Sequence, residues 1–254
     1  TKQGYVGVFN HNRFSGSELH LTMGAYYRKM NNLVSYKSSS NMFRLSDDTW
    51  EDEVDVGEGK SFGAELSASY TSDKFNGTLA YTLSKTTRRY LELNNGKEFP
   101  FKFDRRHILN IQAKYLVSKR RTGKGFRREM YVNGVLAYSS GNMATVYASS
   151  YQGVPMPYWN QRLGVNSFPD EFTELNYNRY EMTSKNGWRM KDYFRIDVAY
   201  TIETHRKGGT SSLSFSIFNL LNRHNAYMIF NEGGKWKQLS IMPIMPSVRW
   251  SKEF

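Results

Sequence analysis

Residues 60–87 read KSFGAELSASYTSDKFNGTLAYTLSKTT, and this stretch decides the fold class. Phe, Ala, Leu and Tyr occupy nearly every second position on both sides of Ser72-Asp73-Lys74, a link short enough for a tight hairpin. A period of two is typical of a β-strand whose two faces meet different surroundings, whereas an amphipathic helix has a period of about 3.6 residues. The stretch therefore predicts two antiparallel strands with one apolar face and one polar face.

The same alternation recurs along the whole chain, and helical periodicity prevails in no window of similar length. We expect an all-β fold with nine long strands, at residues 3–9, 18–29, 60–71, 75–87, 107–117, 128–139, 193–203, 211–219 and 243–254. The links between them are alternately short, at 10–17, 72–74, 118–127 and 204–210, and long, at 30–59, 88–106, 140–192 and 220–242. In an antiparallel order, all the short links should therefore lie at one end of the sheet.

Composition restricts the class of protein further. Of the 254 residues, 39% are apolar and 15% are aromatic, which is more than a disordered chain carries. No 18 consecutive residues are apolar, which argues against a membrane-spanning helix but not against membrane-spanning strands. The chain has no Cys, so disulfide frameworks, thiolate zinc sites and cysteine nucleophiles are excluded.

Two fold classes share the alternation, the soluble β-sandwich and the membrane β-barrel. Sandwich strands usually span about 5 to 6 residues and expose Lys and Glu to water. Most strands expected here span about 10 to 13 residues, which suits a tilted crossing of a bilayer, and their polar face is rich in Ser, Thr, Asn, Gln and Gly. Several apolar runs end in a tyrosine, at the position where the aromatic girdle of a membrane barrel would meet the bilayer interface. These residues are Tyr27, Tyr70, Tyr115 and Tyr138. We favour an antiparallel transmembrane β-barrel segment.

This hypothesis assigns each face of the sheet to a different solvent. The residues expected to face lipid are Leu66, Leu79, Ile111, Leu136, Val198 and Phe215. The residues expected to face a hydrated lumen are Ser67, Thr82, Gln112, Asn133 and Asp197.

Short motifs follow one another along the chain at Gly59–Leu66, Tyr81–Lys85, Phe99–Pro100, Asp104–His107, Ser140–Asn142, Tyr193–Asp197, Phe218–Asn222 and Pro246–Val248. In this order they resemble the C-terminal part of TonB-dependent outer-membrane receptors, over essentially the whole chain. The resemblance implies a 22-stranded barrel with a plug domain inside it, in the outer membrane of a Gram-negative bacterium. It also implies uptake of a large scarce nutrient, such as a siderophore, cobalamin, a glycan or a peptide, driven by a TonB complex.

Nine is an odd number of strands, whereas complete bacterial barrels have an even number. We therefore expect residues 1–254 to be the C-terminal portion of the barrel, with the plug domain and the N-terminal strands absent from this chain. Val248, Trp250 and the terminal Phe254 share one parity and resemble the signal that the outer-membrane assembly machinery reads, although Lys252 departs from the alternation.

The expected partners are outer-membrane lipid and lipopolysaccharide, the plug domain and remaining strands, the TonB complex and the assembly machinery. The net charge of +12 also allows nucleic acid as a partner. However, the basic clusters at 88–89, 119–121, 127–128 and 205–207 lie at strand ends, where lipid headgroups or lipopolysaccharide phosphates would meet them. We favour the membrane surface over nucleic acid.

The link at 140–192 is long and rich in aromatic residues, which is unusual for a plain connection. It either contacts substrate or packs on itself. For contact with substrate, the candidates are Tyr158, Trp159, Arg162 and Trp188, since aromatic rings stack on ring-shaped ligands and Arg binds carboxylate or phosphate. The rival hypothesis is a soluble carbohydrate-binding β-domain that uses the same loop aromatics.

No motif predicts an enzyme. Gly59–Gly63 matches G-x-S-x-G, but Ser61 opens a strand and does not sit on a strand-to-helix turn. The five histidines lack the i, i+4 spacing of a helical zinc site, so we interpret them as solvated or lumen-facing polar residues. We expect no catalytic residue, no metal site and no cofactor.

Overall fold

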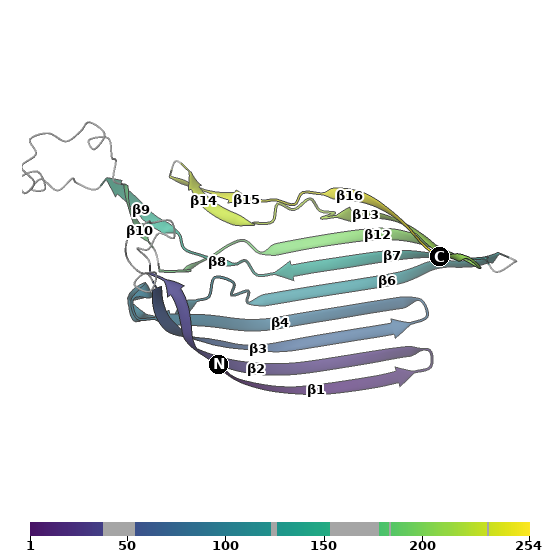
Figure 1. The fold of residues 1–254 in the computed structure, drawn as a ribbon, viewed down its shortest axis with the longest axis horizontal. Coiled ribbons are helices and arrows are strands. Elements are labelled where there is room, and N and C mark those ends of the chain that lie inside the picture. The colour runs from purple at the N-terminus through teal and green to yellow at the C-terminus, as the bar shows by residue number, and fades with distance from the viewer. Residues whose placement is uncertain (38–53, 123–125, 153–177, 183, 233) are drawn as a thin grey trace, which may run out of the picture.

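The computed structural model describes residues 1–37, 54–122, 126–152, 178–182, 184–232 and 234–254. Nine consecutive long strands form one antiparallel sheet in which each strand pairs with the next along the chain (Figure 1). They are β1 (Lys2–Phe14), β2 (Ser17–Tyr36), β3 (Val54–Ser72), β4 (Phe75–Tyr90), β6 (His107–Thr122), β7 (Phe126–Ser139), β12 (Tyr193–Arg206), β13 (Gly209–Phe218) and β16 (Met245–Glu253). The predicted all-β antiparallel fold and all nine predicted strands are confirmed.

Several strands extend beyond the predicted bounds, and β2 shows why. The pairing of β2 with β3 shifts between Met30 and Leu33, and Asn32 has a φ of 56°. Such a bulge inserts extra residues into one strand and reverses the parity of the residues that follow. The alternation therefore breaks near Met30, although the strand continues to Tyr36.

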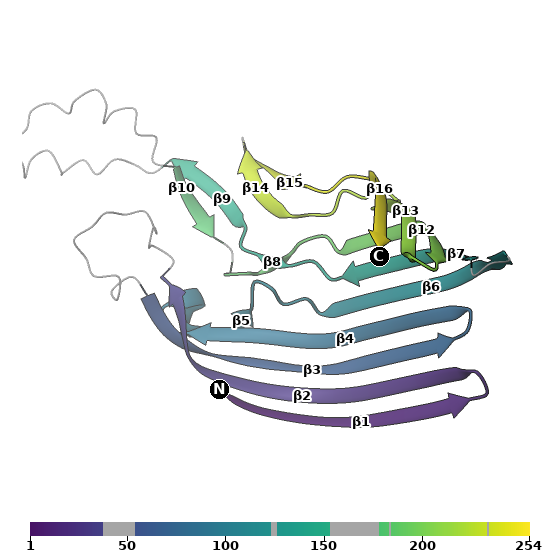
Figure 2. The ribbon, with the colours of Figure 1, turned by 45° about the vertical axis from the view of Figure 1, so that its right-hand side comes forward.

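The predicted separation of short and long links is also confirmed (Figure 1 and Figure 2). Residues 15–16, 73–74 and 207–208 join their strands as two-residue links at one end of the sheet. Gly16 adopts a φ of 79°, which favours glycine in so tight a turn. We call this the short-link end and the opposite end, where β1 begins, the rim.

The long links carry short elements that the sequence did not predict. They are β5 (Phe99–Pro100), β8 (Met143–Ala144), β9 (Tyr147–Gln152), β10 (Asn178–Met182), β11 (Trp188–Arg189), β14 (Met228–Glu232), β15 (Lys235–Leu239) and a 3-10 turn at Leu93–Gly96. β5 pairs with β4, while β9–β10, β8–β11 and β14–β15 form two-stranded pairs. Within the described ranges, no helix is long and apolar enough to cross a membrane.

The strand register collects apolar side chains on one face of the sheet. Directly opposed residues of antiparallel strands share a face, so each row of partners can be followed across the sheet. One apolar row contains Val8, Met23, Leu66, Tyr81, Leu109, Tyr138 and Phe194. The next contains Leu21, Ala68, Leu79, Ile111, Leu136 and Ile196.

The opposite face is more polar, and one of its rows contains Thr22, Ser67, Ala80, Asn110, Ala137 and Arg195. The predicted division between the faces is confirmed for each residue named in the sequence analysis, and Leu79 and Thr82 lie on opposite faces. We call these the apolar face and the polar face.

The apolar face is not covered by another layer of the described structure. Val8 is 72% exposed on β1, Met23 is 61% exposed on β2, and Trp250 is 68% exposed on β16. Among the described residues, the buried hydrophobic side chains are Tyr90, Leu93, Phe99, Met143 and Met190, all near the rim. A soluble sandwich would instead bury such a face against a second sheet.

The sheet is open at both edges within the described chain. β1 pairs with β2 alone and β16 pairs with β13 alone. The first and last strands therefore each present one row of backbone groups that the other described strands do not pair.

Candidate functional site

The rim is organised around the buried carboxylate of Asp104, which is 2% exposed. One oxygen accepts a hydrogen bond from the backbone N–H of Thr86 at 2.7 Å, and the other accepts one from Arg189 at 2.9 Å. Arg189 also donates to the backbone carbonyl oxygens of Asp104 at 2.6 Å and Gly141 at 2.9 Å. A buried charge is tolerated when it is paired and hydrogen-bonded, so this arrangement stabilises the junction of three chain segments.

Two asparagines extend this junction. Asn142 accepts a hydrogen bond from Arg105 at 2.9 Å through its side-chain oxygen. The side-chain amide of Asn186 donates to the carbonyl oxygen of Pro100 at 3.0 Å, while its backbone N–H donates to the Thr145 hydroxyl at 2.9 Å. The links after β4, after β7 and before β12 are thus held in one network.

Asn219 organises the last long link in the same way. It is fully buried, has a φ of 52°, and donates its backbone N–H to the Asp197 carboxylate at 2.9 Å. Its side-chain amide donates to the carbonyl oxygens of Arg223 at 3.1 Å and Met242 at 2.9 Å. Asparagine is among the few residues other than glycine that adopt this left-handed conformation readily, because its short polar side chain bonds locally.

These contacts join four of the sequence motifs in two pairs: Asp104–His107 with Ser140–Asn142, and Tyr193–Asp197 with Phe218–Asn222. Ser140 donates its backbone N–H to the carbonyl oxygen of His107 at 2.9 Å, which joins two of the motifs directly. The motifs therefore have a structural role at the rim, where they fix the positions from which the long links leave the sheet.

The structure places one of the four predicted substrate residues. Trp188 lies in β11, is 43% exposed and precedes Arg189 of the Asp104 network. Tyr158, Trp159 and Arg162 lie outside the described residues. Whether the four side chains form one binding site therefore stays a prediction.

Other aromatic residues of the rim were missed in the sequence analysis. Phe103 is 57% exposed and meets Phe101 edge-on, with ring centroids 5.4 Å apart. The guanidinium of Arg88 lies 3.8 Å from the centre of the Phe101 ring. Tyr227 is also exposed, next to the β14–β15 hairpin. Their position in links directly beside strand ends is a sequence signal that could have found them.

The surroundings of Lys185 and Glu98 in the rim lower the pKa of each group. Burial, reinforced by the charge of Arg88, lowers the pKa of Lys185, whose amino group lies 3.4 Å from the Ser35 hydroxyl. A hydrogen bond with Thr87, together with the Lys60 charge, lowers the pKa of Glu98. Glu98 is therefore ionised at neutral pH, and the rim carries charges of both signs.

The C-terminal residues continue the apolar face. Val248 lies opposite Phe215, and Trp250 lies opposite Leu213. Phe254 follows β16 and is 95% exposed, with the Lys252 amino group 4.1 Å from its ring centre. The shared face of Val248 and Trp250 is confirmed, while their role with Phe254 as an assembly signal stays a prediction.

Several basic residues at the short-link end are already paired with acidic ones. Glu129 is 5% exposed, and its carboxylate lies 3.2 Å from both Lys119 and Arg127 and 3.6 Å from His205. The carboxylate offsets part of the positive charge that these strand ends could offer to nucleic-acid phosphates.

No family model, curated protein or solved structure matches this chain. The resemblance to TonB-dependent receptors therefore stays a prediction, and the hypothesis of function rests on the sheet and its rim.

Proposed function

We propose that this chain forms nine strands of the barrel of a TonB-dependent outer-membrane receptor, and that its function is uptake of a large scarce nutrient. The observation that carries the proposal is the exposed apolar face, which crosses the sheet in continuous rows. Large exposed apolar surfaces of this kind are unfavourable in water and mark contact with lipid or protein. The proposed occupant is the hydrocarbon of the outer membrane.

Strand length supports lipid as the occupant. The nine long strands of the sheet span 9 to 20 residues. A tilted strand needs about 9 to 11 residues to cross the hydrocarbon of a bilayer. In the proposed orientation the apolar face meets the acyl chains and the polar face lines a hydrated interior.

The open edges of β1 and β16 support the view that further strands complete the barrel. In hydrocarbon an unpaired backbone group costs several kcal/mol, so a spanning sheet must close. We propose that strands outside this chain pair with both edges, that a plug domain fills the interior, and that a TonB complex supplies energy for transport.

The rim supports nutrient capture at the cell surface. Long links are typical of the extracellular end of such barrels, and here they are held by the Asp104 and Asn219 contacts. Exposed aromatic residues such as Trp188 and Tyr227 would stack on sugars or other ring-shaped ligands. The proposed substrates are siderophores, cobalamin, glycans or peptides, and the basic strand ends would contact lipid headgroups or lipopolysaccharide phosphates.

Fractionation of the bacterium that produces the protein tests this proposal. We expect the protein in the outer-membrane fraction, resistant to extraction with high salt and released only by detergent. We also expect deletion of the gene to abolish TonB-dependent growth on one scarce nutrient. A protein that is soluble without detergent and binds carbohydrate would instead support the rival carbohydrate-binding domain.

A further inference from the structure

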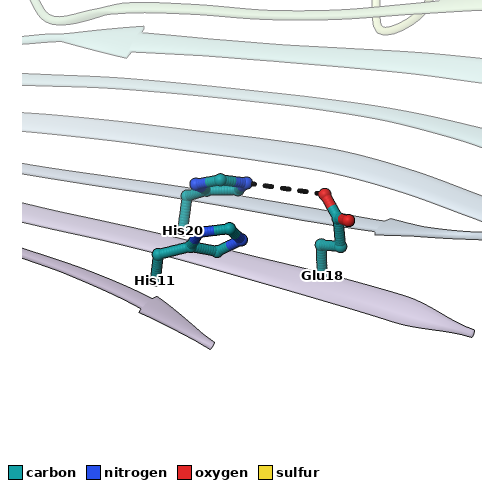
Figure 3. Close-up of side chains that lie close together, drawn as sticks. All are labelled: His11, Glu18 and His20. Carbon is teal, nitrogen blue, oxygen red and sulfur yellow. Dashed lines mark ion pairs between the residues drawn. The ribbon is translucent and has the colours of Figure 1, made fainter. Parts of the chain in front are cut away.

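Two histidines meet across the first hairpin of the sheet. His11 of β1 lies directly opposite His20 of β2, and their rings stack with centroids 4.0 Å apart and an interplanar angle of 15° (Figure 3). Glu18 precedes His20 by two residues in β2 and therefore projects from the same face. Its carboxylate lies 3.8 Å from Nε2 of His20. The three side chains gather on the polar face, beside the hairpin link at 15–16.

Their ligand atoms are close enough for one metal ion. One imidazole nitrogen of each histidine and one carboxylate oxygen of Glu18 all lie within 4.8 Å of one another. Bonds from a transition-metal ion to such atoms measure about 2.0 to 2.2 Å, so two ligands of one ion lie at most about 4.4 Å apart. Because the stacked rings direct their nitrogen lone pairs nearly parallel, the imidazoles must rotate about their side-chain bonds to point at one ion, which their partial exposure allows.

Arg13 fixes the orientation of the Glu18 carboxylate. Its guanidinium pairs with Oε1 of Glu18 at 2.5 Å, which leaves Oε2 directed toward His20. A group that hydrogen-bonds a metal ligand fixes the orientation of that ligand. The Arg13 side chain is 73% exposed, so water screens its charge and weakens its repulsion of a bound cation.

A second cluster, made of Glu129, Glu203 and His205, has similar composition but different surroundings. The Glu129 carboxylate accepts a hydrogen bond from Tyr131 at 2.6 Å and pairs with Lys119 and Arg127, each at 3.2 Å. Both oxygens of the Glu129 carboxylate are therefore held by protein donors, whereas Arg13 pairs with only one oxygen of Glu18, so we interpret the second cluster as an ion-pair network. It provides a matched control for the first.

We infer that His11, Glu18 and His20 form a binding site for a divalent transition-metal ion of the zinc class. Two imidazoles and one carboxylate suit such ions, whereas Ca²⁺ and Mg²⁺ prefer oxygen ligands alone. Three protein ligands leave a coordination position open to water or to a further ligand. The ion would join β1 to β2 beside their link, and this inference does not depend on the proposed membrane location.

Titration of the purified protein with Zn²⁺ in a calorimeter tests the inference. We expect one ion bound by these residues, with affinity reduced at least about tenfold in His11→Ala and in His20→Ala. The matched control His205→Ala should bind as tightly as the wild type. Unchanged affinity in both hairpin variants, or no Zn²⁺ binding by the wild type, would overturn the inference.

Hydrogen exchange provides a second readout that separates metal binding from misfolding. We expect Zn²⁺ to slow exchange of backbone amides in residues 9–20 of the wild type and to leave them unchanged in His11→Ala. Because His11 is exposed on the edge strand, its removal should leave exchange elsewhere in the sheet as in the wild type. Equal slowing in the wild type and His11→Ala would place the ion at another site.

Discussion

Single residues join the rim across long distances in sequence. Asp104 and Arg189 are separated by 85 positions, and Asn219 and Met242 by 23. Asp, Arg and Asn residues indicate that the links between strands are polar. No local sequence pattern, however, predicts which hydrogen-bond donor pairs with which acceptor. The pair His11 and His20 was missed for a related reason: the sequence placed a link at 10–17, whereas the strands continue to Phe14 and from Ser17.

Replacing Arg189 tests how far the rim depends on one buried charge. In Arg189→Met the Asp104 carboxylate, whose side chain is 1% exposed, loses its closest cationic partner. We expect the free energy of unfolding to fall by about 3 kcal/mol, because a buried charge left with only the longer 3.5 Å pairing to Arg106 is costly. Urea unfolding in detergent measures this change. The control Arg105→Met removes one exposed bond to Asn142 and should cost about 1 kcal/mol or less, and equal losses in both variants would contradict the buried role.

Substrate capture is tested by the double variant Trp159→Ala with Arg162→Ala, two residues outside the described structure. We expect nutrient uptake to fall strongly while surface levels stay normal, because stacking and charge recognition are lost together. Growth on the transported nutrient and surface labelling measure the two quantities. Uptake at the wild-type rate would indicate that Trp159 and Arg162 do not contact substrate. Trp188 or residues of another link would then be the next candidates.

Whole strands could be predicted because their period is regular over many residues. All nine long strands and the division of their faces follow from alternation, while the two-residue elements β8 and β11 are too short to have a period. The continuation of β2 to Tyr36 was hidden by its bulge. Elements are thus predictable where the alternation of apolar and polar residues runs over many positions, and unpredictable where single contacts between distant residues determine the structure.

Charge substitutions on β4 test the assignment of its faces. Leu79 lies on the apolar face and Thr82 on the polar face. We expect Leu79→Arg to lower outer-membrane levels strongly, since an Arg facing lipid at the bilayer midplane costs about 2 to 4 kcal/mol. Thr82→Arg should assemble at nearly normal levels. Immunoblots of isolated outer membranes compare the two, and the reverse order of levels would contradict the membrane hypothesis.

The last strand provides a separate test of assembly. Phe254 follows β16, whose outer edge has no partner among the described strands. We expect deletion of Phe254 to lower outer-membrane levels, because recognition by the assembly machinery and closure of the barrel would both suffer. The control Phe254→Tyr keeps the aromatic ring and should retain most assembly. Unchanged levels after the deletion would argue against an assembly signal.

At the scale of the whole molecule, the described sheet has two chemically different faces, and no conventional hydrophobic core covers either face among the described residues. The buried hydrophobic residues of the described chain lie near the rim, and the centre of the sheet exposes its apolar face. The polar face instead carries hydrogen bonds such as that between Asn133 and Thr201. This distribution is expected when lipid, and not protein, covers the apolar face.

Spin labels test that central claim most directly, because the chain has no cysteine and each introduced one is unique within it. Labels are placed by Leu79→Cys and Ile111→Cys on the apolar face and by Thr82→Cys and Gln112→Cys on the polar face. Paramagnetic resonance of the protein in outer-membrane lipid then measures the access of each label to oxygen, which concentrates in hydrocarbon, and to a water-soluble nickel chelate. The membrane account predicts oxygen access at 79 and 111 and nickel access at 82 and 112. Strong nickel access at all four positions would contradict it.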